Sequence, residues 1–199
     1  MIRAAAAALR GGPVLVLLLV ACSSGSSTVS VAPSTPAVST APSAPADLPS
    51  EDPALEALLP DEIGGESTEK LSMRGDGLVA AGSSDPTFAA FIERLDAQPD
   101  QVGVAYAYTL ESEVQAFAYQ VEGVDTDRLV DELQASVQAQ DAATDVTWSE
   151  DSLGDKQVRI GQAAEATDAS IYLYGSGDVV FIIVTDDPAL AAEVATGLP

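Results

Sequence analysis

The chain has 199 residues, of which 31 are Asp or Glu and 8 are Lys or Arg, so its formal net charge is −23 at pH 7. It contains no histidine and one cysteine, which excludes an intrachain disulfide, a zinc site built from His and Cys, and a catalytic pair with His as its base. The acidic balance also argues against nucleic acid as a partner, because phosphate binding requires a basic face.

Residues 1–21 have the three parts of a secretory signal peptide. Arg3 and Arg10 supply a positively charged start, residues 14–20 form an apolar run of seven residues, and the small Ala21 precedes Cys22. The apolar run is too short for a membrane-spanning helix, which needs roughly 20 residues. The segment therefore predicts export of the chain without a spanning helix.

The tetrapeptide Leu19-Val20-Ala21-Cys22 resembles the lipobox of bacterial lipoproteins, Leu-x-Ala/Gly-Cys. This resemblance covers residues 1–22. It implies cleavage before Cys22, a diacylglyceryl thioether on the Cys22 thiol, and further acylation by chains such as palmitate. It places the mature protein outside the cytoplasm, lipid-anchored to the bacterial cell membrane. The alternative is an ordinary cleaved signal peptide followed by an unmodified cysteine.

Residues 22–50 predict a disordered linker. They are rich in Ser, Thr, Pro and Ala, contain no aromatic residue, and carry a single charged side chain, Asp47. Such a segment cannot bury enough apolar surface to offset the entropy of ordering it, and its prolines favour extended polyproline II. We interpret it as a spacer through the envelope. An O-glycosylated stalk is a compatible interpretation.

Residues 51–199 are long enough for one domain with its own core. Three stretches within them show the apolar spacing of a helix buried on one face, and we predict helices over 86–96, 126–139 and 188–197. Each helix is expected to begin after an aspartate that caps its first turn, namely Asp85, Asp125 or Asp187.

Alternating apolar residues predict two hairpins. The first joins strands at 102–110 and 114–121, and the second joins strands within 170–184 through the turn 175–178. Weaker strand signals lie at 71–73, 78–81, 144–148 and 156–160.

Each hairpin precedes a helix, which indicates a weak ββα repeat, with a third, partial copy from Leu71 through the helix at 86–96. We therefore expect an α+β domain in which the helices pack on one face of an antiparallel sheet. The continuous apolar run at 179–184 is consistent with a central strand that is covered on both faces.

Acidic residues near position 125 raise the question of a calcium site, since calcium takes several oxygen ligands. The candidates are Asp125, Asp127, Asp131 and Glu132, but the spacing of an EF-hand loop is absent. We favour helix capping by Asp125, with the other carboxylates beside the positive end of the helix. Asp186 and Asp187 have the same explanation. No metal or cofactor site is predicted.

Trp148 and Glu150 raise the question of carbohydrate chemistry. An indole stacks on a sugar ring, and glycosidases use a pair of carboxyl groups. We favour Trp148 as a core residue at the end of a strand, and Glu150, Asp151 and Asp155 as a solvated turn. The chain has no histidine to act as a base and no Gly-x-Ser-x-Gly motif, so no catalytic residue is predicted.

Two further patterns have both a binding and a structural interpretation. Arg74-Gly75-Asp76 spells an integrin-type tripeptide but fits a turn between two short strands. The five tyrosines could form a binding platform, although we favour their rings at the rim of the core, with wet hydroxyls. They are Tyr106, Tyr108, Tyr119, Tyr172 and Tyr174.

These observations favour a monomeric, non-enzymatic lipoprotein that acts as a binding or interaction module. Its expected partners are the membrane, through the lipid on Cys22, and an envelope protein or a small apolar ligand. One alternative is a carrier of a lipid or another apolar small molecule, with space left by helix alanines. These are Ala89, Ala90, Ala135, Ala191 and Ala192. A cell-wall hydrolase is the third hypothesis, for which Glu150→Gln would be the test.

Overall fold

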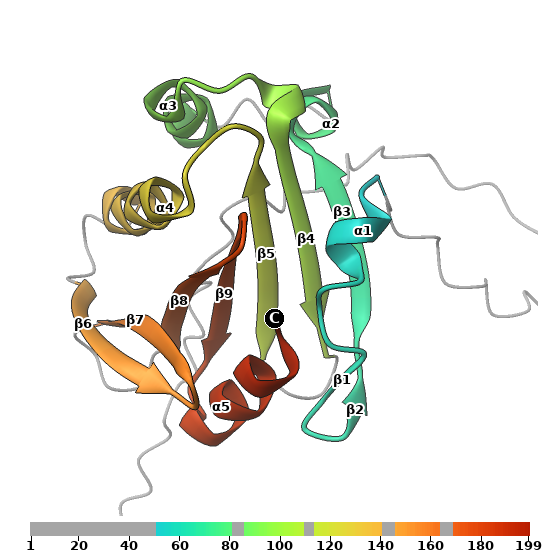
Figure 1. Cartoon of the computed structure of the whole chain (residues 1–199), viewed down its shortest axis with the longest axis vertical. Coiled ribbons are helices and arrows are strands. Elements are labelled where there is room, and N and C mark those ends of the chain that lie inside the picture. Colours follow the sequence, from blue (N-terminus) through green and yellow to red (C-terminus); the bar gives the residue numbers. More distant parts are fainter. Residues whose placement is uncertain (1–50, 81–85, 110–113, 141–145, 164–168) are drawn as a thin grey trace, which may run out of the picture.

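The computed structural model describes residues 51–80, 86–109, 114–140, 146–163 and 169–199 (Figure 1). The predicted signal peptide, Cys22 and the linker lie outside these residues, as do the expected cap Asp85 and the turn at 111–113. Among the described helices, none is long and apolar enough to cross a membrane.

The domain is built on a seven-stranded sheet in which every neighbouring pair of strands is antiparallel. Both predicted hairpins are confirmed, and they meet through the central pair β5–β9. In order across the sheet, the strands are β3 (Glu69–Arg74), β4 (Val102–Tyr108), β5 (Gln115–Val121), β9 (Val179–Thr185), β8 (Ser170–Ser176), β7 (Lys156–Ala163) and β6 (Val146–Leu153).

Five α-helices and a small second sheet complete the described fold. The three predicted helices are confirmed, and the carboxylates of Asp125 and Asp187 accept hydrogen bonds from the first backbone amides of α4 and α5. The elements are α1 (Pro53–Glu56), β1 (Glu62–Ile63), β2 (Glu66–Ser67), α2 (Gly75–Ala80), α3 (Pro86–Leu95), the 3-10 turn Pro99–Gln101, α4 (Thr126–Gln140) and α5 (Pro188–Gly197).

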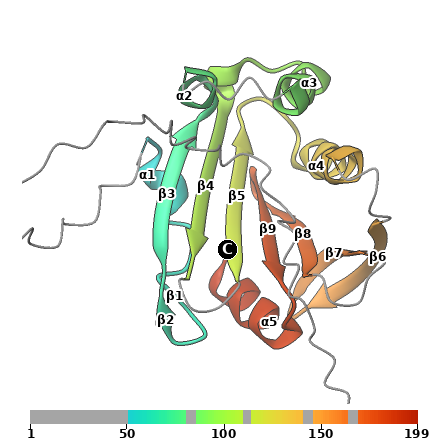
Figure 2. The same cartoon turned by 180° about the vertical axis from the view of Figure 1, so that it is seen from behind.

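The core occupies both faces of the sheet. Side chains alternate along β9, so Val180, Ile182 and Val184 pack with α3 and α4 on one face, here called the α4 face. Val179, Phe181 and Ile183 pack with α1 and α5 on the other, the α5 face (Figures 1 and 2). The predicted α+β class is confirmed.

The prediction that all helices pack on one face is therefore wrong. Its physical reason lies in β4 and β5, where four fully buried alanines line the α5 face and leave room for helices close to the sheet. They are Ala105, Ala107, Ala116 and Ala118.

The predicted repeat holds for the order of elements but not for their packing. The units β4–β5–α4 and β8–β9–α5 are both present, but α4 and α5 lie on opposite faces of the sheet. The third copy lacks its second strand because residues 75–80 form α2, with Leu78 buried and Val79 exposed. A short apolar run does not distinguish a strand from a helix segment.

The strands β6 and β7 extend beyond the predicted ones and form a hairpin with a two-residue turn, Gly154–Asp155. Glu150 and Asp151, predicted in a solvated turn, instead belong to β6 and pair with Arg159 and Val158. The ladder between β7 and β8 is short, with three register pairs from Arg159 to Gly161. The hairpin therefore diverges from β8 near its turn.

Candidate functional site

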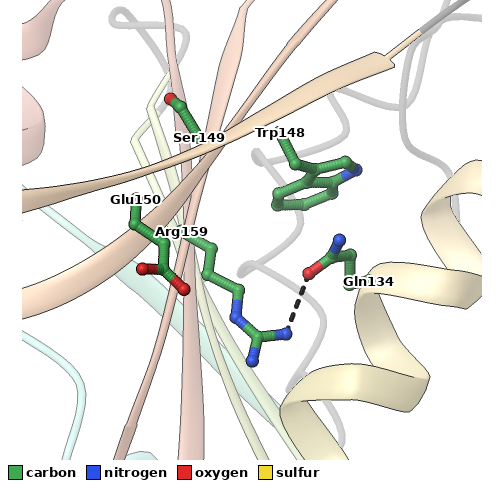
Figure 3. Close-up of a pocket in the computed structure, with 5 residues that line it drawn as sticks. All are labelled: Gln134, Trp148, Ser149, Glu150 and Arg159. Atoms are coloured by element: carbon green, nitrogen blue, oxygen red, sulfur yellow. Dashed lines mark hydrogen bonds between the residues drawn. The ribbon is translucent and has the colours of Figure 1, made fainter.

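Two adjoining grooves open on the α4 face, between α4 and the strands β6, β7 and β8. One has a volume of about 270 Å³ and is lined by Gln134, Trp148, Ser149, Glu150 and Arg159 (Figure 3). We call it the α4–β6 groove. The other has a volume of about 370 Å³ and lies between the first turns of α4 and strands β7 and β8. Arg159 lines both grooves and so separates them.

Arg159 connects the hairpin to α4. Its Nη1 donates to Oδ1 of Asp131 at 2.6 Å and to Oε1 of Gln134 at 2.9 Å. The two acceptors are three residues apart on α4, so they share one side of that helix. A permanently charged side chain is thus held across the grooves by two acceptors on the same helix.

Trp148 is half-buried at the margin of the α4-face core. It stands opposite Gly161 in the β6–β7 ladder, and its six-membered ring fills the space where a side chain at 161 would lie. A Cβ atom placed on Gly161 would be 3.0 Å from Cη2 and Cζ2 of the indole. The core interpretation of Trp148 therefore accounts for one part of the ring, while the same residue also lines the groove.

Glu150 supplies the groove with a carboxylate that could accept hydrogen bonds from a ligand. It is exposed, and it makes no hydrogen bond or ion pair with any other described residue, although it stands opposite Arg159 in the ladder. Figure 3 shows its carboxylate on one side of Arg159, with Trp148 and Gln134 on the other. A free acceptor, an aromatic ring and amide and guanidinium donors are thus gathered in one groove.

Three of the four carboxylates weighed for calcium bind other partners. Asp125 caps α4, Asp131 accepts from Arg159, and Oε2 of Glu132 accepts from Nε of Arg94 at 2.6 Å. Within the described ranges, no group of three or more His, Cys, Asp or Glu side chains is placed to hold a metal ion.

The tyrosines divide between the two faces and do not form one platform. Tyr106 and Tyr119 are buried on the α4 face, whereas Tyr172 and Tyr174 are buried on the α5 face. Burial raises the pKa of Tyr106 to about 12. The hydroxyl of Tyr108, at the margin of this core, donates to Oε2 of Glu69 at 2.6 Å, which raises its pKa. The core interpretation is confirmed for the four buried rings, but the expected wet hydroxyl is wrong for Tyr174, whose hydroxyl oxygen is buried without a hydrogen-bond partner among the described residues.

Arg74 is engaged within the fold, which leaves the integrin-type tripeptide without an exposed arginine. Its guanidinium forms ion pairs with Asp52 at 3.5 Å and Glu122 at 3.2 Å and donates to the carbonyl oxygen of Asp100. Arg74 ends β3 and Gly75 begins α2, so the predicted turn between two strands is wrong.

The helix alanines do not outline a cargo cavity. Ala89 and Ala135 are exposed, Ala90 and Ala192 are half-buried, and only Ala191 of the five is buried against the sheet. The positions of these alanines therefore do not support the carrier hypothesis, which expected them to leave space for a cargo.

Comparison with known protein families, with curated protein sequences and with solved structures gave no match. The candidate site therefore rests on its own geometry. Sequence reasoning missed Arg159 and Gln134. One signal was available, since Lys156 and Arg159 are the only cations after Arg128 in a strongly acidic chain.

Proposed function

We propose that the chain is a lipid-anchored, extracytoplasmic binding module, without enzymatic activity, whose α4–β6 groove holds a neutral carbohydrate. The observation that carries this proposal is the convergence of an indole, a free carboxylate and planar donors on one open groove. The lipobox resemblance at Cys22 and the Ser/Thr/Pro/Ala linker support the anchor and the spacer.

The lining matches the chemistry of a sugar. Each sugar hydroxyl both donates and accepts hydrogen bonds, and the C–H face of a sugar ring packs on an aromatic surface. Glu150 would accept from hydroxyl groups. The Gln134 amide nitrogen would donate, because its oxygen already accepts from Arg159. A neutral ligand is favoured because a mature chain starting at Cys22, with 6 basic and 31 acidic residues, has a net charge of −25 and repels anions.

The same geometry favours binding over hydrolysis. Glycosidases of the two-carboxyl type need both groups free to act on one glycosidic bond. Here Glu150 is free, but Asp131, on the facing helix, accepts a 2.6 Å hydrogen bond from Arg159. With Asp131 paired to Arg159, Glu150 is the one free carboxylate among the described residues that line the groove, and the two-carboxyl mechanism requires two.

The chain offers an internal probe for the test, because Trp148 is its only tryptophan. The detergent-solubilised full chain is titrated with neutral tetrasaccharides of N-acetylglucosamine and of β-linked glucose. We expect a saturable change in tryptophan emission. Glu150→Gln should weaken binding by about 10-fold, as expected for a hydrogen bond to a charged group.

Val79→Ala, a change at an exposed residue of α2 outside the groove, is the matched control and should leave binding unchanged. The absence of any saturable change across the panel would contradict the carbohydrate proposal. Release of new reducing ends, lost in Glu150→Gln, would replace it with the hydrolase hypothesis.

A further inference from the structure

The two edges of the seven-stranded sheet differ in how they are closed. Beside β3, the backbone N–H of Glu51 donates to the carbonyl oxygen of Ser72 at 3.3 Å, and that of Asp52 donates to the Ser72 hydroxyl at 2.7 Å. A side-chain oxygen of Glu51 also accepts from the backbone N–H of Arg74. At the opposite edge, β6 pairs with β7 alone within the described ranges.

The hairpin geometry shows which backbone groups of β6 face outward. In a hairpin with a two-residue turn, the pair that flanks the turn, here Leu153 and Lys156, exchanges both hydrogen bonds. The N–H and C=O groups of Ser152, Glu150, Trp148 and Val146 therefore point away from β7. The N–H of Ser152 accordingly donates to Oδ1 of Asp151 at 2.7 Å instead of to β7.

This arrangement leaves a short stretch of the edge available. Val146, Trp148 and Glu150 present their backbone N–H and C=O groups outward, while the N–H of Ser152 is already bonded. An open row of this kind accepts an additional strand. The Asp151–Ser152 contact limits the stretch at its turn end.

The edge also carries uncompensated negative charge. Glu150 and Asp151 are exposed and adjacent, so their side chains lie on opposite faces of the sheet. The two cations of the hairpin are committed elsewhere, Lys156 to Asp155 at 3.8 Å and Arg159 to Asp131 at 2.6 Å. The edge therefore presents, on each face, one carboxylate that forms no ion pair with any described residue.

We propose that the β6 edge is a docking site for an extended, basic segment of a partner protein, which adds as an antiparallel strand. Its two consecutive Lys or Arg residues would stand opposite Glu150 and Asp151, one on each face of the sheet. Opposite charges directly across a ladder stabilise the pairing, and like charges destabilise it. Glu150 also lines the α4–β6 groove, whereas Asp151 lies on the other face of the sheet, so a change at Asp151 tests docking separately from sugar binding.

Two other occupants fit the edge less well. In a second copy that pairs antiparallel through these outward-facing residues, Glu150 would stand opposite the partner's Glu150 or diagonal to it, which brings like charges together. The chain's own linker is interrupted by prolines, which have no N–H to donate to a ladder.

The test uses a fluorescent ten-residue peptide of alternating Val and Thr with a central Lys-Arg pair, added to the detergent-solubilised full chain. Fluorescence anisotropy should show saturable binding that weakens as salt is raised. A peptide with Glu-Glu in place of Lys-Arg should not bind. Binding of both peptides with equal affinity would overturn the proposal.

Backbone methylation of the peptide separates strand addition from simple charge attraction, without changing the protein. N-methyl groups on the residues whose N–H groups face β6 should weaken binding at least roughly 10-fold, whereas the same groups on the alternate residues should not. An equal effect of the two methylation patterns would overturn the proposal.

A protein variant and hydrogen exchange complete the test. Asp151→Lys should weaken binding of the Lys-Arg peptide, and Asp186→Lys, an equal charge change at an exposed residue outside the hairpin, should not. The backbone amides of Trp148 and Glu150 should gain protection when the peptide binds. Their protection in a concentration-dependent manner without peptide would assign the edge to a second copy, and protection confined to other strands would also refute the proposal.

Discussion

Arg159 and Glu150 stand opposite each other in the β6–β7 ladder, yet the Arg159 guanidinium donates to Asp131 and Gln134 of α4. An arginine and a glutamate at such positions can form a stabilising cross-strand ion pair. Here the arginine links the hairpin to α4, and the glutamate remains free in the α4–β6 groove. The Glu150 carboxylate is therefore available to a ligand because Arg159 binds Asp131 and Gln134 instead.

We expect Arg159→Met to weaken carbohydrate binding by about 10-fold while changing the free energy of unfolding by only about 0–1 kcal/mol. The Arg159 and Asp131 side chains are 31% and 66% exposed, so solvent screens their ion pair. Tryptophan fluorescence titration and urea unfolding measure the two quantities. A loss of stability as large as that of a core truncation would show that the link to α4 is chiefly structural.

Gly161→Ala tests the support beneath Trp148. The added methyl group would lie 3.0 Å from the indole, so the ring must move. We expect a shift of tryptophan emission in the unliganded protein, weaker sugar binding, and destabilisation of about 1–3 kcal/mol. Gly197→Ala is the control, because no atom lies within 4 Å of a Cβ at that position. Identical emission spectra for the two variants would contradict the packing of Trp148 on Gly161.

Ala118→Leu tests the two-faced core. Ala118 is fully buried on the α5 face, so the larger side chain should push against the elements covering it and cost about 1–3 kcal/mol. Ala135→Leu on the exposed side of α4 is the matched control and should change stability by less than about 0.5 kcal/mol. If helices covered only the α4 face, both substitutions would be tolerated equally in thermal unfolding.

The raised pKa of Tyr106 predicts that the protein loses stability at alkaline pH. Burial raises its pKa to about 12 in the folded state, against about 10 when unfolded. Its stabilising contribution is complete below the unfolded pKa and is lost as the pH rises toward the folded pKa. Unfolding measured between pH 9 and pH 12 should therefore depend less steeply on pH in Tyr106→Phe than in the parent. An unchanged slope would contradict this assignment.

Cys22→Ser tests the proposed anchor. We expect the parent to partition with membranes and to carry a mass increase at Cys22 that matches acyl groups, and the variant to lose both. Native mass spectrometry of the parent also tests the carrier alternative, since a tightly held cargo would add mass that disappears on denaturation. A parent that is soluble and unmodified would contradict the anchor.

Much of the fold could be predicted because its central elements have strong periodicity. The apolar faces of α3 and α4 and the alternation in β4 and β5 identify those elements without tertiary information. The edge of the sheet could not be predicted in the same way. Residues 149–152 are all polar, and they form a strand because β7 pairs with them, not because of their own propensity.

The candidate site shows the same limit. The sequence raises carbohydrate chemistry for Trp148 and Glu150 but favours a structural role for each. Their relation to Gln134 and Arg159 depends on how α4 lies over the sheet. The continuous apolar run in β9 indicated a strand covered on both faces. Helix spacing alone does not tell which face each helix covers.

The positions of the closed β3 edge and the open β6 edge also orient the domain relative to its tether. Glu51, where the described domain begins, is held against β3, and β6 is the opposite edge, six strand spacings or roughly 29 Å across a flat sheet. With the anchor proposed at Cys22, the tether would enter on the side of the domain farthest from the groove and from the open edge. The groove and the open β6 edge would then both face away from the membrane attachment.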